Sequence, residues 1–277
     1  MMTSTKALRG LGYCSVVISL LASATAIALD ANTEDARAIA KAVEDRDTGD
    51  RSTANATLKL IDQSGKERAR KLREMTMKFP GGKKTRMFFE APADVRNTGF
   101  LSVDYDAGEK DDDQWLYLPS LHRSTRIAGS DKSGSFMGSD LTYADMTKRD
   151  TSEYDYSLIE KSAKVDGEDC WLIESRPRSE AEKKETGYLK TQAWISKSKL
   201  IRMQVKAWVI EGKKIKYMKF GDVRQIDGIW VAHQVTVRTV RGTQVESSTV
   251  FELSDVKFNQ PGVDADQFAE RRLEQGL

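Results

Sequence analysis

Between Asn55 and Phe258 apolar and polar side chains alternate, which is the period of a β-strand with one buried face. The alternation is broken at intervals by turn residues, many of them glycine, at distances typical of hairpins. The predicted strands are residues 55–62, 71–79, 85–92, 99–105, 114–119, 122–128, 154–160, 170–177, 188–196, 200–210, 214–220, 229–240 and 245–258.

No long helical pattern separates successive strands, so the crossovers that a parallel sheet needs are not available. The sheet is therefore expected to be antiparallel. One apolar face on each of many strands indicates a sheet that wraps around a common interior. Such a sheet either closes on its own side chains or leaves a cavity.

Two helices are expected outside the sheet. Residues 32–47 have a polar start, with Asn32 or Thr33 as the cap, and apolar residues at helical spacing. That apolar face consists of Ala36, Ile39, Ala40 and Val43. Residues 264–275 predict a second helix at the end of the chain.

The first residues have the order of a secretory signal peptide: Lys6 and Arg9, an apolar run at 13–22, and small residues at 24–28. We expect residues 1–28 to be removed after Ala28 and residues 29–277 to form a single domain. The apolar run is too short for a membrane span, although a short N-terminal anchor is an alternative.

Charge and cysteine content exclude several classes of protein. The chain has 44 basic and 42 acidic residues, and without Lys6 and Arg9 the two are equal in number. No basic block suggests nucleic-acid binding, and the charged runs at 182–185 and 212–219 are interpreted as solvated faces. Cys170 is the single cysteine after residue 28, so the exported domain has to be held together by core packing.

The residues offer no catalytic constellation. The two histidines, His122 and His233, are far apart in sequence, and His233 falls on the apolar face of a strand. Motifs for nucleophilic, zinc or nucleotide chemistry are missing from the sequence. The acidic stretch 103–115 has neither the glycine nor the glutamate of a calcium loop at the required positions. We expect no enzyme activity, no metal and no cofactor.

The predicted inner face is rich in methionine, an unbranched side chain that adapts to irregular apolar guests. Ordinary core filling is the alternative for each of these methionines. The side chains expected to line a lipid-binding interior are Met75, Met77, Met87, Phe89, Met203, Val205 and Val235.

Several segments together resemble one bacterial family: "WLYLP" at 115–119, "GSFMGSDLTYADM" at 134–146, "IDGIWVAHQVTV" at 226–237 and "DADQFAERRLEQ" at 264–275. The chain resembles the LolA-like, or outer membrane lipoprotein-sorting, proteins. The resemblance implies a mainly β (α+β) fold, an incomplete antiparallel β-barrel with short helices as a lid. It also implies a periplasmic carrier for acyl chains.

The resemblance further implies partners: a lipoprotein or lipid as cargo, an inner-membrane transporter and an outer-membrane acceptor, with the carrier itself monomeric. A non-enzymatic docking module of an inner-membrane lipid exporter, without its own lipid, is the alternative function. An enzyme that processes lipids is a third, for which the sequence supplies no pair of nucleophile and base.

Within the shared motif, the glycine- and serine-rich residues 133–146 carry large apolar side chains. We expect Phe136, Met137, Leu141 and Tyr143 to form a rim or lid over the interior; a buried anchor is the alternative. Arg123 and Arg126 are candidates for contact with a lipid head group, although a salt link to Asp111–Asp113 or Asp145 is the favoured interpretation.

Overall fold

A computed structural model describes residues 29–106 and 110–276. The expected signal peptide, residues 1–28, lies outside the described residues. In the part of the chain that is described, no helix has the length and apolarity needed to cross a membrane.

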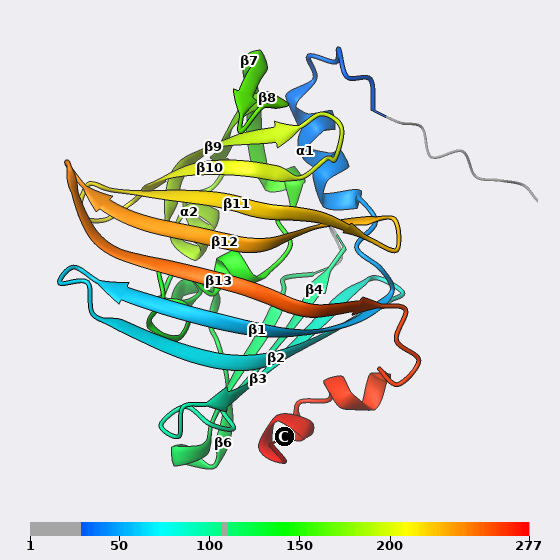
Figure 1. Cartoon of the computed structure of the whole chain (residues 1–277), viewed down its shortest axis with the longest axis vertical. Helices are drawn as coiled ribbons and strands as arrows, with labels where there is room; N and C mark the ends of the chain where they lie inside the picture. Colours follow the sequence, from blue (N-terminus) through cyan, green and yellow to red (C-terminus); the bar gives the residue numbers. More distant parts are fainter. Residues whose placement is uncertain (1–28, 107–109, 277) are drawn as a thin grey trace, which may run out of the picture.

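One 13-stranded sheet dominates the molecule, and every pair of neighbouring strands is antiparallel (Figure 1). Its order is β6-β5-β4-β3-β2-β1-β13-β12-β11-β10-β9-β8-β7. The strands are β1 Arg51–Asp62, β2 Glu67–Phe79, β3 Gly82–Ala91, β4 Gly99–Tyr105, β5 Asp113–Leu118, β6 Arg123–Arg126, β7 Tyr154–Val165, β8 Glu168–Pro177, β9 Tyr188–Ser196, β10 Arg202–Val209, β11 Lys214–Ile226, β12 Ile229–Arg241 and β13 Gln244–Phe258.

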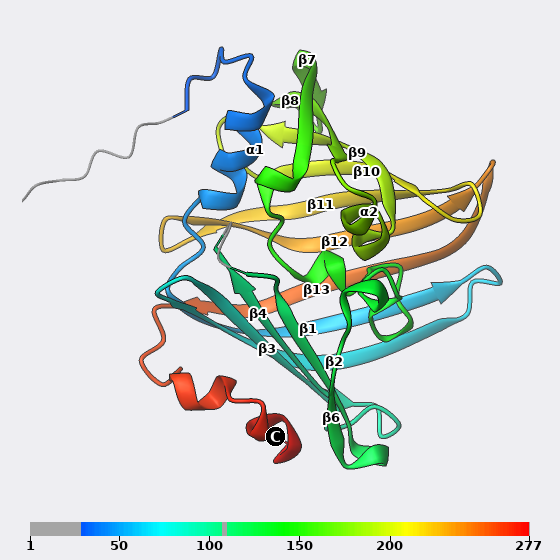
Figure 2. The same cartoon turned by 180° about the vertical axis from the view of Figure 1, so that it is seen from behind.

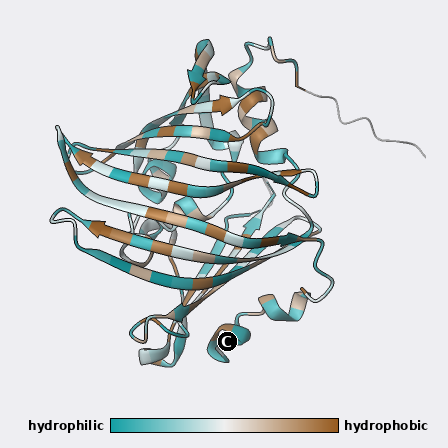
Figure 3. Cartoon of the chain, viewed as in Figure 1, coloured by the Kyte–Doolittle hydropathy of each residue, from teal (hydrophilic) through white to brown (hydrophobic). Residues whose placement is uncertain are grey.

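The sheet is strongly curved but not closed, because β6 and β7 stand at opposite ends of the strand order and do not pair. The predicted mainly β, incomplete antiparallel barrel is thereby confirmed. Alternating apolar and polar bands run along the strands, as the sequence pattern requires (Figure 3). The inner face carries the main core, which includes the fully buried Leu58, Phe89, Phe100 and Trp171.

The segment between β6 and β7 enters the concave side of the sheet instead of running over the surface (Figure 2). It consists of short 3₁₀ turns joined by irregular chain. These turns are η2 Gly129–Asp131, η3 Phe136–Gly138, η4 Ala144–Met146 and η5 Thr151–Glu153. Since this segment joins the two ends of the open sheet, it crosses the interior and is packed against the inner face.

Two short α-helices flank the interior. Helix α1, Ala36–Asp45, buries the predicted apolar face, but its cap is Asp35, whose side chain accepts from the backbone N–H groups of Arg37 and Ala38. The cap predicted at Asn32 or Thr33 is therefore wrong, because Asp35 supplies the acceptor nearer to the first apolar residue.

Another helix, between β8 and β9, was not expected from the sequence. Helix α2, Glu180–Thr186, begins at the Ser179 cap and ends at Gly187, whose φ of 77° suits glycine. It contains the charged run 182–185, interpreted from the sequence as a solvated face. Because this helix is short and carries few apolar residues, no helical period marks it.

The end of the chain covers the outer face of the sheet. The helix predicted at 264–275 is divided into a 3₁₀ turn, η6 Ala265–Phe268, and a single turn of α-helix, α3 Arg271–Glu274. Phe268 and Leu273 pack there against Phe88 and Leu101. This outer cluster also contains Met77, and Met75 packs against it. The expectation that these two methionines line the interior is therefore wrong.

A β-bulge changes the face of Met203. Arg202 pairs with Ile195 and Gln204 with Trp194, so Met203 is the extra residue between two pairs. Met203 consequently packs with Ile201 and Cys170 in a separate cluster, whereas Val205 lies in the main core. The expectation that Met203 shares the inner face with Val205 fails because strict alternation does not continue through a bulge.

Candidate functional site

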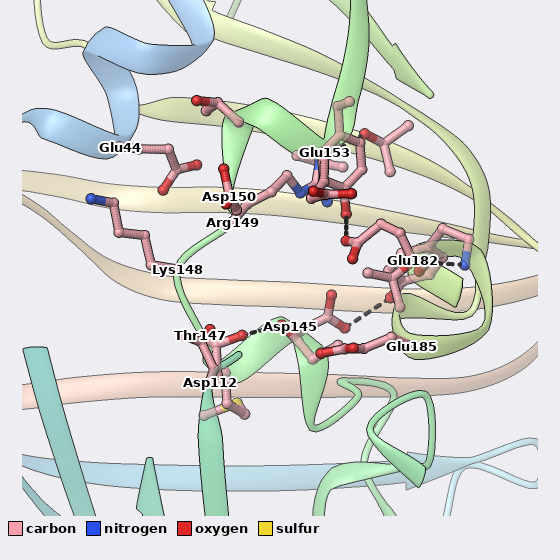
Figure 4. A pocket seen from close by; sticks show the side chains of 18 of the residues that line it. Glu44, Asp112, Asp145, Thr147, Lys148, Arg149, Asp150, Glu153, Glu182 and Glu185 are labelled. Carbon is pink, nitrogen blue, oxygen red and sulfur yellow. Dashed lines mark hydrogen bonds between the residues drawn. The ribbon is translucent and has the colours of Figure 1, made fainter. Parts of the chain in front are cut away.

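A cavity of about 1030 Å³ lies between the inner face of the sheet and the elements that cross it. Its walls come from α1, α2, η4, η5 and the inner faces of β9 to β13. This volume is at the upper end of the roughly 300–1,000 Å³ of ordinary ligand pockets. Figure 4 shows many of the polar side chains that surround it.

The sheet side of the cavity is apolar. We call it the apolar floor, and it consists of Ala193, Val205, Ala207, Met218, Phe220, Val235 and Phe251. Cross-strand pairing brings these side chains together, since Val205 is opposite both Ala193 and Met218, and Val235 is opposite both Phe220 and Phe251. Because Ala193 on β9 and Ala207 on β10 have small side chains, space remains above the floor.

The neighbouring part of the interior is filled by residues 134–146, which we call the plug. Phe136 at its centre is fully buried. Its ring centroid lies 5.3 Å from that of Phe100 and 5.6 Å from that of Tyr143, both in edge-to-face geometry, and 6.3 Å from that of Phe89. Such aromatic contacts add to the stabilisation from burial itself.

Polar bonds hold the plug against the sheet. The buried carboxylate of Asp140 accepts from the hydroxyls of Thr239, Ser247 and Thr249, the last at 2.7 Å. The Asp140 backbone N–H donates back to Thr249 Oγ1 at 2.8 Å. Gln114 Nε2 donates to the Tyr143 carbonyl at 2.8 Å. The plug is thus tied to β5, β12 and β13 through Asp140 and Tyr143.

Charged side chains, among them those of Asp112, Glu182 and Glu185, form part of the remaining walls of the cavity, and Lys132 contacts this part without lining the cavity itself. The nearly buried Lys132 ammonium donates to Glu185 Oε1 on α2 at 2.6 Å and to the Asp112 carbonyl at 3.0 Å. Burial, together with the negative charge of Asp104, raises the pKa of the Asp112 carboxyl to about 7. Burial likewise raises the pKa of Glu182, which accepts a hydrogen bond from the Tyr154 hydroxyl.

Arginines lie at the end of the cavity near α1. Arg202 forms an ion pair with Glu44 of α1. Arg149 Nη1 donates to Ser175 Oγ and Thr191 Oγ1, both at 3.2 Å, and its Cζ lies 4.8 Å from the Tyr154 ring centroid. The cavity therefore combines one apolar surface with a charged, mixed-sign surface, which suits an amphiphile.

Comparisons with known proteins agree with this architecture. A family model described as an uncharacterized protein matches residues 81–275. A crystal structure described as an outer membrane lipoprotein-sorting protein domain from Vibrio parahaemolyticus is 30% identical, covers 87% of this chain and 99% of its own, and superposes with a TM-score of 0.77. A DUF1329 family protein from Desulfovibrio piger has the same identity and coverage and a TM-score of 0.78.

The chain belongs to the same family as these two proteins, the outer membrane lipoprotein-sorting or DUF1329 family. A LolA superfamily protein from Nitrosomonas europaea, at 17% identity, shares the fold over 86% of this chain and 98% of its own, with a TM-score of 0.63. No curated protein sequence matches the chain significantly.

The structure separates the residues that the sequence predicted to bind lipid. Val205 and Val235 are in the apolar floor. Met87 and Phe89 are on the inner face but are buried in the core beside the plug and do not line the cavity. Met75, Met77 and Met203 lie in the other clusters described above.

The expected rim residues are also divided. Phe136 is enclosed by other aromatic rings, which is the geometry of an anchor, whereas Leu141 lines the cavity. Met137 and Tyr143 pack partly buried against the main core. Arg126 is paired with Asp113, as in the favoured alternative, and Arg123 is exposed on the edge strand β6, outside the cavity walls.

Sequence reasoning did not place Met218, Phe220, Phe251 or Arg149 among the ligand contacts, although the pattern allows Met218 on the methionine-rich inner face. The first three lie on apolar alternations that had been recognised, but their meeting depends on the register between strands. His233 lies away from the cavity walls, and its Nδ1 is 3.1 Å from the Asp222 carbonyl. Among residues 29–106 and 110–276 no group of His, Cys, Asp and Glu is arranged to hold a metal ion.

Proposed function

We propose that this LolA-like protein is a non-enzymatic carrier that holds the acyl chains of a lipid or lipoprotein in the cavity and moves them across the periplasm toward the outer membrane. The observation that carries the proposal is the unfilled space above the apolar floor. The proposed direction, toward the outer membrane, is supported by the membership of this chain in a lipoprotein-sorting family. The proposed compartment, the periplasm, is supported by the secretory character of residues 1–28.

The energetics of acyl chains require such a container. Each methylene transferred out of water contributes about 0.8 kcal/mol, so a chain of roughly sixteen carbons resists release into water by about 13 kcal/mol. A carrier has to replace membrane hydrocarbon with apolar side chains. The floor residues supply this surface, while the charged walls remain in contact with the polar end of the cargo.

The first experiment tests for cargo directly. The protein is purified gently from the periplasm, its organic extract is analysed by mass spectrometry, and the transfer of pyrene-labelled phosphatidylethanolamine from vesicles is measured. We expect stoichiometric lipid in the extract and saturable uptake of the probe. Absence of both would favour the alternative of a docking module without its own lipid.

A matched pair of variants locates the binding surface. Val235→Trp places a large ring in the space above the floor, whereas Val250→Trp places the same ring on the outer face of the adjacent strand β13. We expect Val235→Trp to abolish uptake and Val250→Trp to retain it, with both variants folded by circular dichroism. Equal uptake by the two variants would contradict lipid binding on the floor.

A further inference from the structure

Arg149 differs from the other arginine of the cavity wall in having no acidic partner. Arg202 is neutralised by Glu44. Within residues 29–106 and 110–276 no carboxylate oxygen lies within 4.0 Å of the Arg149 guanidinium. Its described hydrogen bonds are both made by Nη1 and both end on neutral hydroxyls, Ser175 and Thr191.

A guanidinium in a partly dehydrated wall is stabilised far better by an anion than by neutral oxygens. The planar fork of arginine matches carboxylate and phosphate groups, which it can bind through two parallel hydrogen bonds. In Arg149 the Nε and Nη2 donors make no hydrogen bond to any described residue. Since Arg149 lines the cavity, these donors are available to a ligand there.

The partners of Arg149 adjoin the apolar floor. Thr191 is opposite Ala207, and Ala193, two residues farther along β9, is opposite Val205. Residues two apart on a strand point to the same face, so Arg149, its hydroxyl partners and the floor border one continuous surface. A molecule with a charged group at Arg149 can therefore lay its apolar part directly on the floor.

We propose that the cavity binds an amphiphile with one anionic group, a phosphodiester or a carboxylate, and that Arg149 binds this group with Ser175 and Thr191 beside it. The inference rests on the proposed function and narrows its cargo to an anionic head group with attached acyl chains.

Nearby carboxylates restrict the charge of the ligand. Asp145 and Glu182 line the same cavity, and their described partners include the hydroxyls of Tyr188 and Tyr154. For a ligand with one negative charge bound at Arg149, the repulsion from these carboxylates would not outweigh the attraction to the guanidinium. A second negative charge on the ligand would be repelled by the carboxylates. We therefore expect phosphatidic acid, which can carry two charges, to bind less tightly than phosphatidylethanolamine.

Three variants of the full exported protein test the assignment. Arg149→Gln removes the charge, Arg149→Lys keeps the charge without the fork, and Arg176→Gln is the matched control. Arg176 is next to Ser175 on β8, but it points to the outer face and pairs with Glu174. The probes are dipalmitoyl phosphatidylethanolamine, palmitate and uncharged dipalmitoylglycerol, measured by competition with the pyrene-labelled lipid.

We expect Arg149→Gln to weaken phosphatidylethanolamine or palmitate binding by about tenfold to a hundredfold, the loss expected for hydrogen bonds to a charged group. Binding of dipalmitoylglycerol should change by less than about twofold on the same scale. Arg149→Lys should give an intermediate loss and Arg176→Gln none. A loss confined to one charged probe identifies whether the anion is a phosphodiester or a carboxylate.

Two outcomes would overturn the proposal. Unchanged binding of both charged probes by Arg149→Gln would show that Arg149 does not bind the head group. In that case a loss of uptake in Val235→Trp would still support the proposed carrier function. An equal loss for charged and uncharged probes would show that Arg149 only supports the wall. If the wild-type protein bound none of the probes, the proposed function itself would fail.

Discussion

The interior has two parts that lie on the same sheet, and only one of them has its apolar surface covered by other side chains. Over β1 to β4 the plug covers the inner face, and Phe136 fills the space between Phe89 and Phe100. Over β9 to β13 the apolar floor has no such cover and faces the cavity. Apolar alternation alone does not distinguish the two parts; the presence of a tethered aromatic plug does.

If the floor binds lipid as proposed, stability and binding depend on different parts of the interior. Close packing makes the plugged part the main source of stability, since each lost contact there opens a cavity in a dense core. The floor can remain incompletely packed because the strands beneath it are held by the same hydrogen-bonded sheet. Substitutions in the plugged part should therefore lower the free energy of unfolding and leave lipid uptake unchanged. Substitutions in the floor should lower lipid uptake and leave the protein folded.

The largest effect is expected from Phe136→Ala. Truncation of a fully buried phenylalanine typically costs about 3–5 kcal/mol of unfolding free energy. Chemical denaturation measures this loss, with the partly buried Met137→Ala as a control that should cost less. Lipid uptake per folded molecule should stay near wild type. A folded Phe136→Ala protein of normal stability that releases its lipid would instead support a lid.

A smaller loss of stability is expected when the hydrogen bonds that hold the plug against the sheet are weakened. Asp140→Asn keeps the size of the side chain but removes the charge that three hydroxyls contact. Hydrogen bonds to charged groups contribute about 1.5–3 kcal/mol, so a destabilisation in this range is expected by denaturation. The exposed Asp155→Asn serves as the control. A stability equal to wild type would show that the plug does not depend on these bonds.

A pH-dependent effect is expected at the charged wall. Burial and the charge of Asp104 raise the pKa of Asp112 from 3.8 to about 7, so the folded protein binds this proton more tightly than the unfolded chain. The stabilisation is complete below pH 3.8 and is lost as the pH rises through about 7. Asp112→Asn, which cannot ionise, should therefore gain melting temperature over wild type at pH 8 more than at pH 5. A constant difference across this range would contradict the raised pKa.

The smallest effect is expected outside both parts of the interior. Arg126 is exposed and pairs with Asp113 at the edge of the sheet. Exposed ion pairs contribute little because water and salt screen them. Arg126→Ala should leave the melting temperature and lipid uptake unchanged within error. A clear loss of uptake would restore Arg126 as a candidate for head-group contact.

Much of the fold follows from local pattern. Alternation, turn residues and the absence of intervening helices predict an antiparallel sheet, and motif resemblance predicts its incomplete closure. Helix α2 and the break between η6 and α3 could not be predicted, because short elements carry too few apolar positions to show a period. For the site, Val205 and Val235 could be predicted as inner-face residues, whereas Arg149 lies in irregular chain without any pattern.

The sequence by itself determined which strands exist and that each has one apolar face, since both depend on neighbours within a few residues. Tertiary structure decided which apolar face became core, outer cluster or cavity floor. Met77 is on the outer face under the C-terminal helices, and a single bulge turns Met203 away from Val205. These outcomes depend on register, on bulges and on which distant segment covers each surface, and those contacts join residues far apart in the chain.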